Sequence, residues 1–223
     1  MIRLFNENIS EKITINCEQF AYLQKVMRVK VGDEISIFNP NDGEFLFQIT
    51  CIEKRFLEVS KIRLLRGFQP QEQKIFCVFS KIKQKNAELI IQKCTEIGVH
   101  GFIPMITART VEKNLNIERL TKIAIEACEQ CGRIDIPEIL PEITINELEQ
   151  LSGKLILLSQ FSGTSSLKID GNAFVISGPE GGLTKQELEF LEGISTQLNV
   201  SKNILRSETA AILGCGIVMN SII

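Results

Sequence analysis

A glycine-rich segment directly follows an apolar, strand-like run, and its composition suits a binding loop. The run is Ala173–Ser177, and residues 178–182 read Gly-Pro-Glu-Gly-Gly. Three glycines in five residues let a backbone pass close to a ligand or adopt positive φ angles, which side chains would prevent. Thr184 and Glu187 have the T-x-x-E spacing of a capping box, which predicts a helix start. Because ligands of open α/β sheets bind beyond the carboxyl ends of strands, this loop is a candidate binding site.

The spacing of these glycines excludes two common phosphate sites. It matches neither GxGxxG nor GxxxxGK followed by Ser or Thr, and Lys185 does not follow the last glycine directly. A small cofactor without a phosphate therefore fits the loop better than a dinucleotide or ATP. The alternative that needs no ligand is a tight turn in which glycine is required.

Arg206 and Glu208 stand where the last expected helix begins. The amino terminus of a helix favours anions, so Glu208 has a structural use there. Arg206 is electrostatically disfavoured at the same place, because the helix terminus is itself positive. We therefore expect its side chain to contact a group other than this helix. Lys81, Arg109 and Arg133 have ordinary structural roles when each is taken alone.

Histidine and cysteine usage excludes several kinds of chemistry. His100 is the only histidine, which excludes HExxH metalloprotease chemistry and other multi-histidine metal sites. The seven cysteines are scattered and odd in number, which suits a reducing compartment. Cys128 and Cys131 form one CxxC pair without further ligands, so no metal site is predicted. No apolar run reaches the roughly 18 residues of a membrane helix, and we expect a cytoplasmic protein.

The charge of the chain is unevenly distributed. A net charge of −2 does not predict a nucleic-acid binder, yet 20 of the 25 Lys and Arg residues precede residue 141. Clusters such as Lys25, Arg28 and Lys30 allow positive patches on an acidic chain. A solvated surface explains the same clusters equally well.

Two patterns of secondary structure meet at residues 67–71, a polar stretch that contains Gly and Pro. Before it, alternating segments and one helix predict a small β-barrel, with strands at 34–38, 45–52 and 56–65 and the helix at 18–29. After it, strands and helices alternate, which predicts an α/β domain with a mostly parallel sheet. The expected strands there are 75–79, 102–104, 155–158, 173–177 and 197–200, and the expected helices are 87–97, 117–131, 145–151, 184–191 and 208–222.

Six segments in a fixed order give the chain a resemblance that none of them carries alone. They are residues 22–33; Lys81 with residues 91–98; Arg109; residues 126–133 with Pro137; residues 178–182; and residues 204–210. By these segments the chain resembles the RsmE family of 16S ribosomal RNA uridine-N3 methyltransferases, of the SPOUT or trefoil-knot superfamily. It departs from the family at Phe20 and Ala21, where a histidine is usual, and at residues 200–203, which replace Leu-Gly-x-Arg.

The resemblance implies two domains, a cofactor and a homodimer. Residues 1–70 would form a PUA/OB-like β-barrel that binds RNA. Residues 71–223 would form a SPOUT domain that binds S-adenosylmethionine and whose carboxyl end threads a trefoil knot. The dimer would pack through the knot region, and the last helix agrees with this, because its apolar residues cover more than one face.

The implied reaction is methylation of uridine N3 in 16S rRNA of the small ribosomal subunit, without metal or membrane. The cofactor-binding residues that the resemblance implies are Leu158, Gly178, Pro179, Glu180, Gly181, Gly182, Leu198, Val200, Ile204, Leu205 and Arg206. We hypothesise that Arg206 stabilises the developing uridine anion and that Glu208 or Glu180 assists proton removal. The expected RNA contacts are Arg28, Lys30, Lys81, Arg109 and Arg133.

Two alternatives remain open from the sequence. One is a non-catalytic RNA-binding or ribosome-assembly protein that lost its chemistry at the departure in residues 201–203. The other is a knotted methyltransferase that acts on transfer RNA. Methyl incorporation into small-subunit RNA distinguishes both from the implied function.

Overall fold

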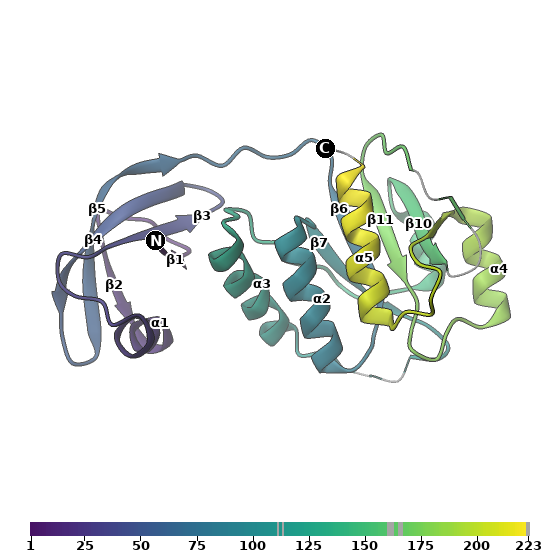
Figure 1. The fold of residues 1–223 in the computed structure, drawn as a ribbon, viewed down its shortest axis with the longest axis horizontal. Helices are drawn as coiled ribbons and strands as arrows, with labels where there is room; N and C mark the ends of the chain where they lie inside the picture. The colour runs from purple at the N-terminus through teal and green to yellow at the C-terminus, as the bar shows by residue number, and fades with distance from the viewer. Residues whose placement is uncertain (111, 113, 160–162, 165–166, 222–223) are drawn as a thin grey trace. The chain divides into compact units, whose positions relative to one another are not determined.

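The computed structural model describes residues 1–110, 112, 114–159, 163–164 and 167–221 (Figure 1). The chain divides into two units. The amino-terminal unit comprises Met1–Pro70 and Cys128–Ile136, and the carboxyl-terminal unit comprises Gln71–Ala127 and Pro137–Ile223. Residues 128–136 therefore group with the first seventy residues, from which they are far apart in the sequence.

The amino-terminal unit is built on a five-stranded sheet with the strand order β1-β3-β4-β5-β2. Its strands are β1 (Ile2–Phe5), β2 (Lys12–Asn16), β3 (Glu34–Asn39), β4 (Gly43–Ile52) and β5 (Phe56–Arg66). β1 pairs parallel with β3, and the other neighbours are antiparallel. The three strands expected from alternation are confirmed as β3, β4 and β5, whereas β1 and β2 were not expected.

The single helix expected at residues 18–29 is replaced by two shorter pieces. They are α1 (Cys17–Ala21) and a π-helix, η1 (Tyr22–Met27). The helical segment ends at Arg28, whose φ of 54° lies in the left-handed region. The apolar pattern predicts a helix but does not say which hydrogen-bond spacing it adopts, because the π form is a local variation.

A buried carboxylate, Glu44, is the polar centre of the amino-terminal unit. Its Oε1 accepts hydrogen bonds from Arg3 Nε and Ser36 Oγ, both at 2.8 Å, and its Oε2 accepts one from Arg66 Nε at 2.8 Å. Burial alone would raise the pKa of Glu44, but these hydrogen bonds lower it from 4.5 to about 2. Arg3 also donates to the carbonyl oxygen of Cys128 at 2.6 Å, which ties residues 128–136 to the sheet.

The carboxyl-terminal unit contains a seven-stranded sheet with the order β12-β10-β11-β6-β7-β8, and β9 also pairs with β7. Its strands are β6 (Ile75–Ser80), β7 (Gly101–Ile106), β8 (Glu138–Ile139), β9 (Ile143–Thr144), β10 (Lys154–Ser159), β11 (Ala173–Ser177) and β12 (Thr196–Asn199). Every pairing is parallel, which confirms the expected parallel α/β sheet. The two-residue strands β8 and β9 were not expected.

Four α-helices accompany this sheet among the described residues, namely α2 (Gln84–Ile97), α3 (Ile117–Cys131), α4 (Lys185–Ile194) and α5 (Ser207–Asn220). The expected capping box is present, because Thr184 Oγ1 accepts from the backbone N–H of Glu187 at 3.3 Å and starts α4. Residues 145–151, expected as an α-helix, instead contain the 3-10 helix η2 (Ile145–Gln150). Residue 222 of the expected last helix lies outside the described residues.

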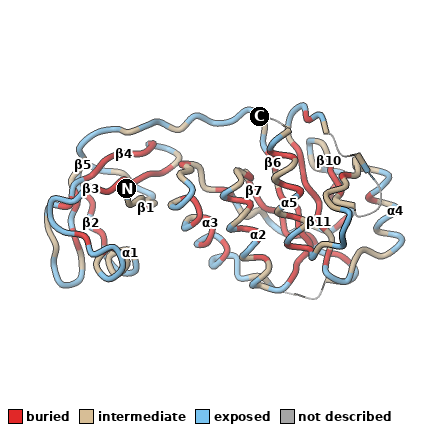
Figure 2. Tube along the Cα trace, in the orientation of Figure 1, coloured by how far each residue is buried: buried red, intermediate tan, exposed pale blue. Residues whose placement is uncertain are grey.

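Alternate residues of the strands enter two different apolar layers. Ile75, Cys77 and Phe79 of β6 belong to a cluster with α2 and α5, whereas Val78 belongs to one that includes Leu191 of α4. Figure 2 shows the strands of this sheet as largely buried. The sheet is thus covered on both faces, as a parallel sheet requires.

The helices of the described residues are short or carry polar side chains. None of them is both long enough and apolar enough to span a bilayer.

Candidate active site

A cavity of about 700 Å³, the first cavity, opens at the carboxyl ends of four neighbouring parallel strands of the carboxyl-terminal unit. Lys83 and Asn86 follow β6, residues 178–180 and 182–183 follow β11, and residues 200–201 and 203–208 follow β12. Leu158 and Ser159 at the end of β10, Ser177 at the end of β11, Leu188 of α4 and Ala210 of α5 complete the lining. This is the edge at which the sequence predicted a ligand.

The glycine-rich loop bends sharply beside the first cavity. The backbone N–H of Gly182 donates to the carbonyl oxygen of Pro179 at 2.9 Å, and Gly182 has a φ of 70°. A side chain at this position would strain the backbone. At Gly178, an added Cβ would lie 3.3 Å from Leu183 Cγ. Gly182 is therefore required by the turn, and Gly178 is required by the close approach of Leu183.

Two buried serines join this loop to the start of α5. Ser207 Oγ donates to the carbonyl oxygen of Gly178 at 2.5 Å, and Ser177 Oγ donates to the carbonyl oxygen of Ser207 at 3.1 Å. Sequence reasoning missed both serines, although each adjoins a predicted site residue. Their hydrogen bonds fix the distance between the two loops that carry the candidate catalytic residues.

Arg206 and Glu208 both line the first cavity but differ in exposure. Arg206 is exposed and is the N-cap residue of α5, and its side chain makes no hydrogen bond or ion pair within the described part of the chain. Glu208 is only 6% exposed, and its Oε2 has no hydrogen-bond partner among the described residues. A buried, unsatisfied carboxylate oxygen is costly, so it marks a place where a ligand donor would be favourable.

Glu180 faces the first cavity from the glycine-rich loop and is held by α2. Its Oε1 accepts a hydrogen bond from Asn86 Nδ2 at 3.2 Å. Sequence analysis missed Asn86 and Lys83. The rule that ligands gather at strand ends could have found them, because they come directly after β6.

Nine of the eleven expected cofactor-binding residues line the first cavity. They are Leu158, Gly178, Pro179, Glu180, Gly182, Val200, Ile204, Leu205 and Arg206. The structure places Leu198 in the apolar core at 0% exposure, and Gly181 lies in the loop outside the lining. Leu158 packs against α5, where a Cβ on Gly214 would lie only 2.5 Å from Leu158 Cδ2.

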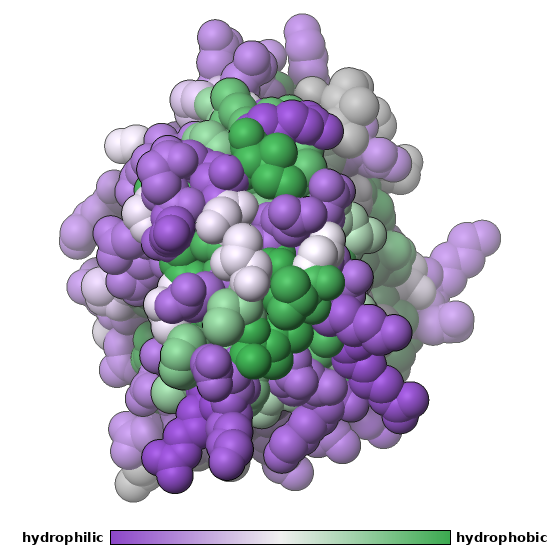
Figure 3. All heavy atoms as spheres, turned by 90° about the vertical axis from the view of Figure 1, so that its left-hand side faces the viewer, coloured by the Kyte–Doolittle hydropathy of each residue, from purple (hydrophilic) through white to green (hydrophobic). Residues whose placement is uncertain are grey.

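The five expected RNA contacts lie in different surroundings. Arg28 and Lys30 are exposed on the amino-terminal unit, close in sequence to Val26, Met27 and Val31, which are also exposed. Figure 3 shows a face of the molecule on which hydrophobic patches lie among hydrophilic side chains.

The other three expected RNA contacts have partners within the chain. Lys81 is 4% exposed, and its Nζ lies 2.7 Å from Glu142 Oε2. Arg109 Nη1 donates to the carbonyl oxygen of Gly181 at 2.7 Å. Arg133 pairs with Asp135 at 2.5 Å.

Three buried thiols form a cluster that the spacing of the cysteines does not predict. The Sγ atoms of Cys77, Cys94 and Cys215 lie within 4.8 Å of one another. Hydrogen bonding to Cys77 and Cys94, together with burial, raises the pKa of Cys215 well above its ordinary value. None of the three lines the first cavity. The cluster belongs to the apolar layer between the sheet, α2 and α5.

Comparison with known proteins gives matches over nearly the whole chain. A family model described as an RNA methyltransferase domain matches residues 69–219, and one described as an RNA methyltransferase PUA domain matches residues 15–62. The ribosomal RNA small subunit methyltransferase E of Rickettsia conorii is 38% identical over 201 residues, which cover 86% of this chain and 82% of the relative.

Two solved structures with bound S-adenosylmethionine have the same fold. A methyltransferase E from Neisseria gonorrhoeae is 25% identical with a TM-score of 0.85, and a Legionella pneumophila protein is 26% identical with a TM-score of 0.86. Each comparison covers 99% of this chain and 97% of the other.

The parallel sheet, the cavity at its edge and these matches define an RNA methyltransferase with a PUA domain. The chain belongs to the ribosomal RNA small subunit methyltransferase E family. The expected fold class, an α/β domain of the SPOUT type preceded by a small PUA-like β domain, is confirmed.

Proposed function

We propose that this chain methylates N3 of a uridine in 16S rRNA of the small ribosomal subunit, with S-adenosylmethionine as the methyl donor. One observation carries the proposal: the first cavity combines a glycine-rich loop, the exposed cation Arg206 and the unsatisfied carboxylate Glu208. Membership of the family and the bound S-adenosylmethionine in two structures of the same fold support it.

The residues of the first cavity suit S-adenosylmethionine. Gly178 and Gly182 line the first cavity without side chains, and Leu158, Val200 and Leu205 supply apolar walls for a planar ring. When bound, S-adenosylmethionine supplies a methyl group that its sulfonium charge has already activated. The main task of the protein is then to align the reactants and exclude water.

The nucleophile needs more help than the methyl donor, because uridine N3 bears a weakly acidic imide proton. The Arg206 guanidinium stabilises the negative charge that develops on the uracil ring. Glu208 Oε2 accepts the N3 proton, or Glu180 does so while Asn86 holds it in place. Since N3 faces its pairing partner inside a duplex, the target uridine is unpaired or flipped out.

RNA binding requires cations beyond the first cavity. Arg28 and Lys30 would contact phosphates directly, whereas Lys81, Arg109 and Arg133 would exchange or share their present partners. Replacing one contacting residue lowers the salt slope of RNA binding by about one unit. An unchanged slope would remove that residue from the interface.

Residues 1–70 act as the RNA-binding domain, and residues 71–223 act as the methyltransferase domain. Two copies associate as a homodimer through α5, on which Leu213 is 40% exposed. The enzyme works in the cytoplasm on small ribosomal subunits, without a metal ion.

The test is transfer of a tritiated methyl group to 30S subunits that lack the modification, compared with protein-free 16S rRNA and with transfer RNA. Label at a uridine of the small-subunit RNA supports the proposal, and chemical mapping identifies the atom. Label only in transfer RNA would overturn the substrate assignment. Cofactor binding by calorimetry without any transfer would indicate a non-catalytic RNA-binding protein.

A further inference from the structure

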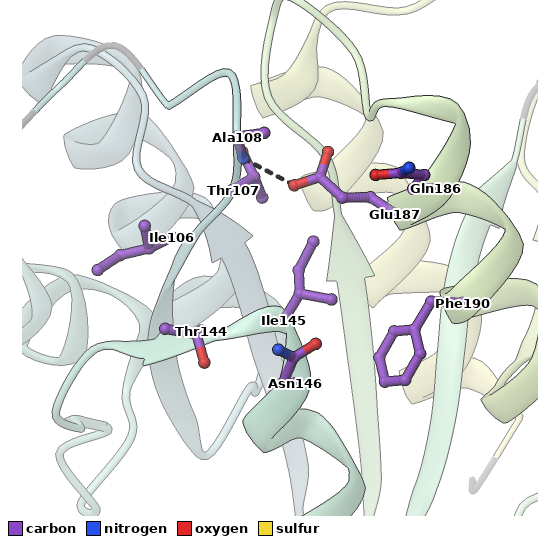
Figure 4. A pocket seen from close by; sticks show the side chains of 9 residues that line it. All are labelled: Ile106, Thr107, Ala108, Thr144, Ile145, Asn146, Gln186, Glu187 and Phe190. Carbon is purple, nitrogen blue, oxygen red and sulfur yellow. Dashed lines mark hydrogen bonds between the residues drawn. The ribbon is translucent and has the colours of Figure 1, made fainter.

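A second cavity, of about 490 Å³, lies at the carboxyl ends of β7 and β9 in the same sheet (Figure 4). Its lining comes from three segments: residues 106–108 at the end of β7, residues 144–146 at the start of η2, and Gln186, Glu187 and Phe190 of α4. It shares no lining residue with the first cavity. The function proposed above leaves it unused.

The edge of the second cavity is held rigidly by Glu187. Its Oε1 accepts from the backbone N–H of Ala108 at 2.7 Å, and its Oε2 accepts from Thr184 N at 2.8 Å and Thr184 Oγ1 at 2.9 Å. Burial raises the pKa of Glu187, but these hydrogen bonds outweigh that effect and lower it. The carboxylate is therefore charged and already has its partners.

The groups left for a ligand are two amides and an apolar surface. The side chains of Asn146 and Gln186 are exposed and make no hydrogen bonds within the described residues. The Phe190 ring faces the cavity, and Ile106, which is 37% exposed, adds apolar area (Figure 4). Each amide offers both donors and an acceptor, as the edge of a nucleobase does, and an aromatic ring stacks on bases.

The charge of the lining disfavours the phosphates of an RNA strand. Among the described residues, neither Lys nor Arg lines the second cavity, and the Glu187 carboxylate lies within it. A phosphate is therefore disfavoured there, whereas an uncharged planar base is not. We propose that the second cavity binds one unpaired nucleobase of the RNA substrate, distinct from the uridine that is methylated.

The two cavities are mechanically connected through one loop and one helix. Ala108 lines the second cavity, and the adjacent Arg109 donates to Gly181 of the glycine-rich loop at 2.7 Å. On α4, Leu188 lines the first cavity while its neighbour Glu187 lines the second. A base in the second cavity thus helps to place the strand relative to the first cavity. This inference rests on the proposed function.

The kinetic test uses three variants and undermethylated 30S subunits. Phe190→Ala and the double variant Asn146→Ala/Gln186→Ala remove the stacking ring and the amides, and Glu192→Ala is the control on an exposed position of α4 outside both linings. We expect KM for the 30S subunit to rise roughly tenfold in the first two, with kcat and cofactor affinity within twofold of wild type. The amide variant is the safer one, because both residues are exposed.

A second readout identifies the base. Base-specific chemical probes applied to the 30S complex should show one nucleotide, besides the target, that wild type protects and Phe190→Ala does not. If KM and protection are unchanged in both variants while wild type methylates normally, the second cavity is not a base site. If wild type itself transfers no methyl group, the proposed function fails instead.

Discussion

Glu44 and Glu208 are almost equally buried, yet the chain treats their carboxylates in opposite ways. Glu44 is 4% exposed, and its oxygens accept hydrogen bonds from two arginines and a serine hydroxyl. Glu208 is 6% exposed, and one of its oxygens has no partner. The difference teaches that burial alone does not identify a functional carboxylate. What separates them is whether the protein supplies the hydrogen bonds that burial demands.

The largest expected effect is that of Arg206→Ala, which tests whether the cavity that contains Glu208 is catalytic. Removing a cation that stabilises transition-state charge should lower kcat by about a thousandfold while calorimetry still detects cofactor binding. Lys202→Ala is the control, because Lys202 is an exposed cation on the same loop that does not line the cavity. Near-normal turnover in Arg206→Ala would refute the assigned role.

Glu44→Gln tests whether the buried Glu44 carboxylate stabilises the fold. Because folding lowers the pKa of Glu44 from 4.5 to about 2, its carboxylate contributes about 3 kcal/mol at neutral pH. That contribution is complete above pH 4.5 and is lost as the pH falls toward 2. Urea unfolding should therefore show a large loss of stability at neutral pH and a smaller difference from wild type in acid. Glu34→Gln, at an exposed position of β3, serves as the control.

Glu208→Gln keeps the shape of the side chain and removes the proton acceptor. We expect kcat to fall about a hundredfold and its dependence on pH to flatten, with unfolding almost unchanged. Both results together would show that Glu208 acts in catalysis, whereas Glu44 stabilises the fold. A loss of stability without a change in the pH profile would contradict the catalytic role and make the two carboxylates alike.

The smallest expected effect concerns the loop beside Glu208. Gly182→Ala places a side chain at a φ of 70° and should cost about 1 to 2 kcal/mol of stability, with weaker cofactor binding. Gly193→Ala is a matched control inside α4, where an added Cβ meets nothing within 4 Å and should stabilise the helix. Equal effects of the two substitutions on cofactor affinity would show that the loop geometry is unimportant for binding.

The sequence predicts those parts of the molecule that depend on local pattern. Alternation and helical spacing identify the parallel sheet, and the Thr184–Glu187 box marks the start of α4. The glycine-rich loop stands out by its composition directly after a strand, and Arg206 stands out because a cation is disfavoured at the start of a helix. These signals are contained within a few neighbouring residues.

Features that depend on long-range packing were missed. The thiol cluster joins Cys77, Cys94 and Cys215, which only the folded sheet and two helices bring together. Residues 128–136 group with the amino-terminal unit through hydrogen bonds to Arg3. The second cavity was missed for the same reason, since its three segments come from separate parts of the chain.

The close contact between Gly214 and Leu158 requires a glycine in the middle of α5, and this glycine lowers the stability of the helix. Alanine would favour the helical state over glycine by up to about 1 kcal/mol at an interior position. The chain nevertheless keeps a glycine there, because an added Cβ would lie only 2.5 Å from Leu158 Cδ2 and Leu158, which lines the first cavity, would have to shift. The lower helix propensity of glycine is thus tolerated because it keeps Leu158 in position. Substitutions intended to stabilise this enzyme should therefore avoid position 214.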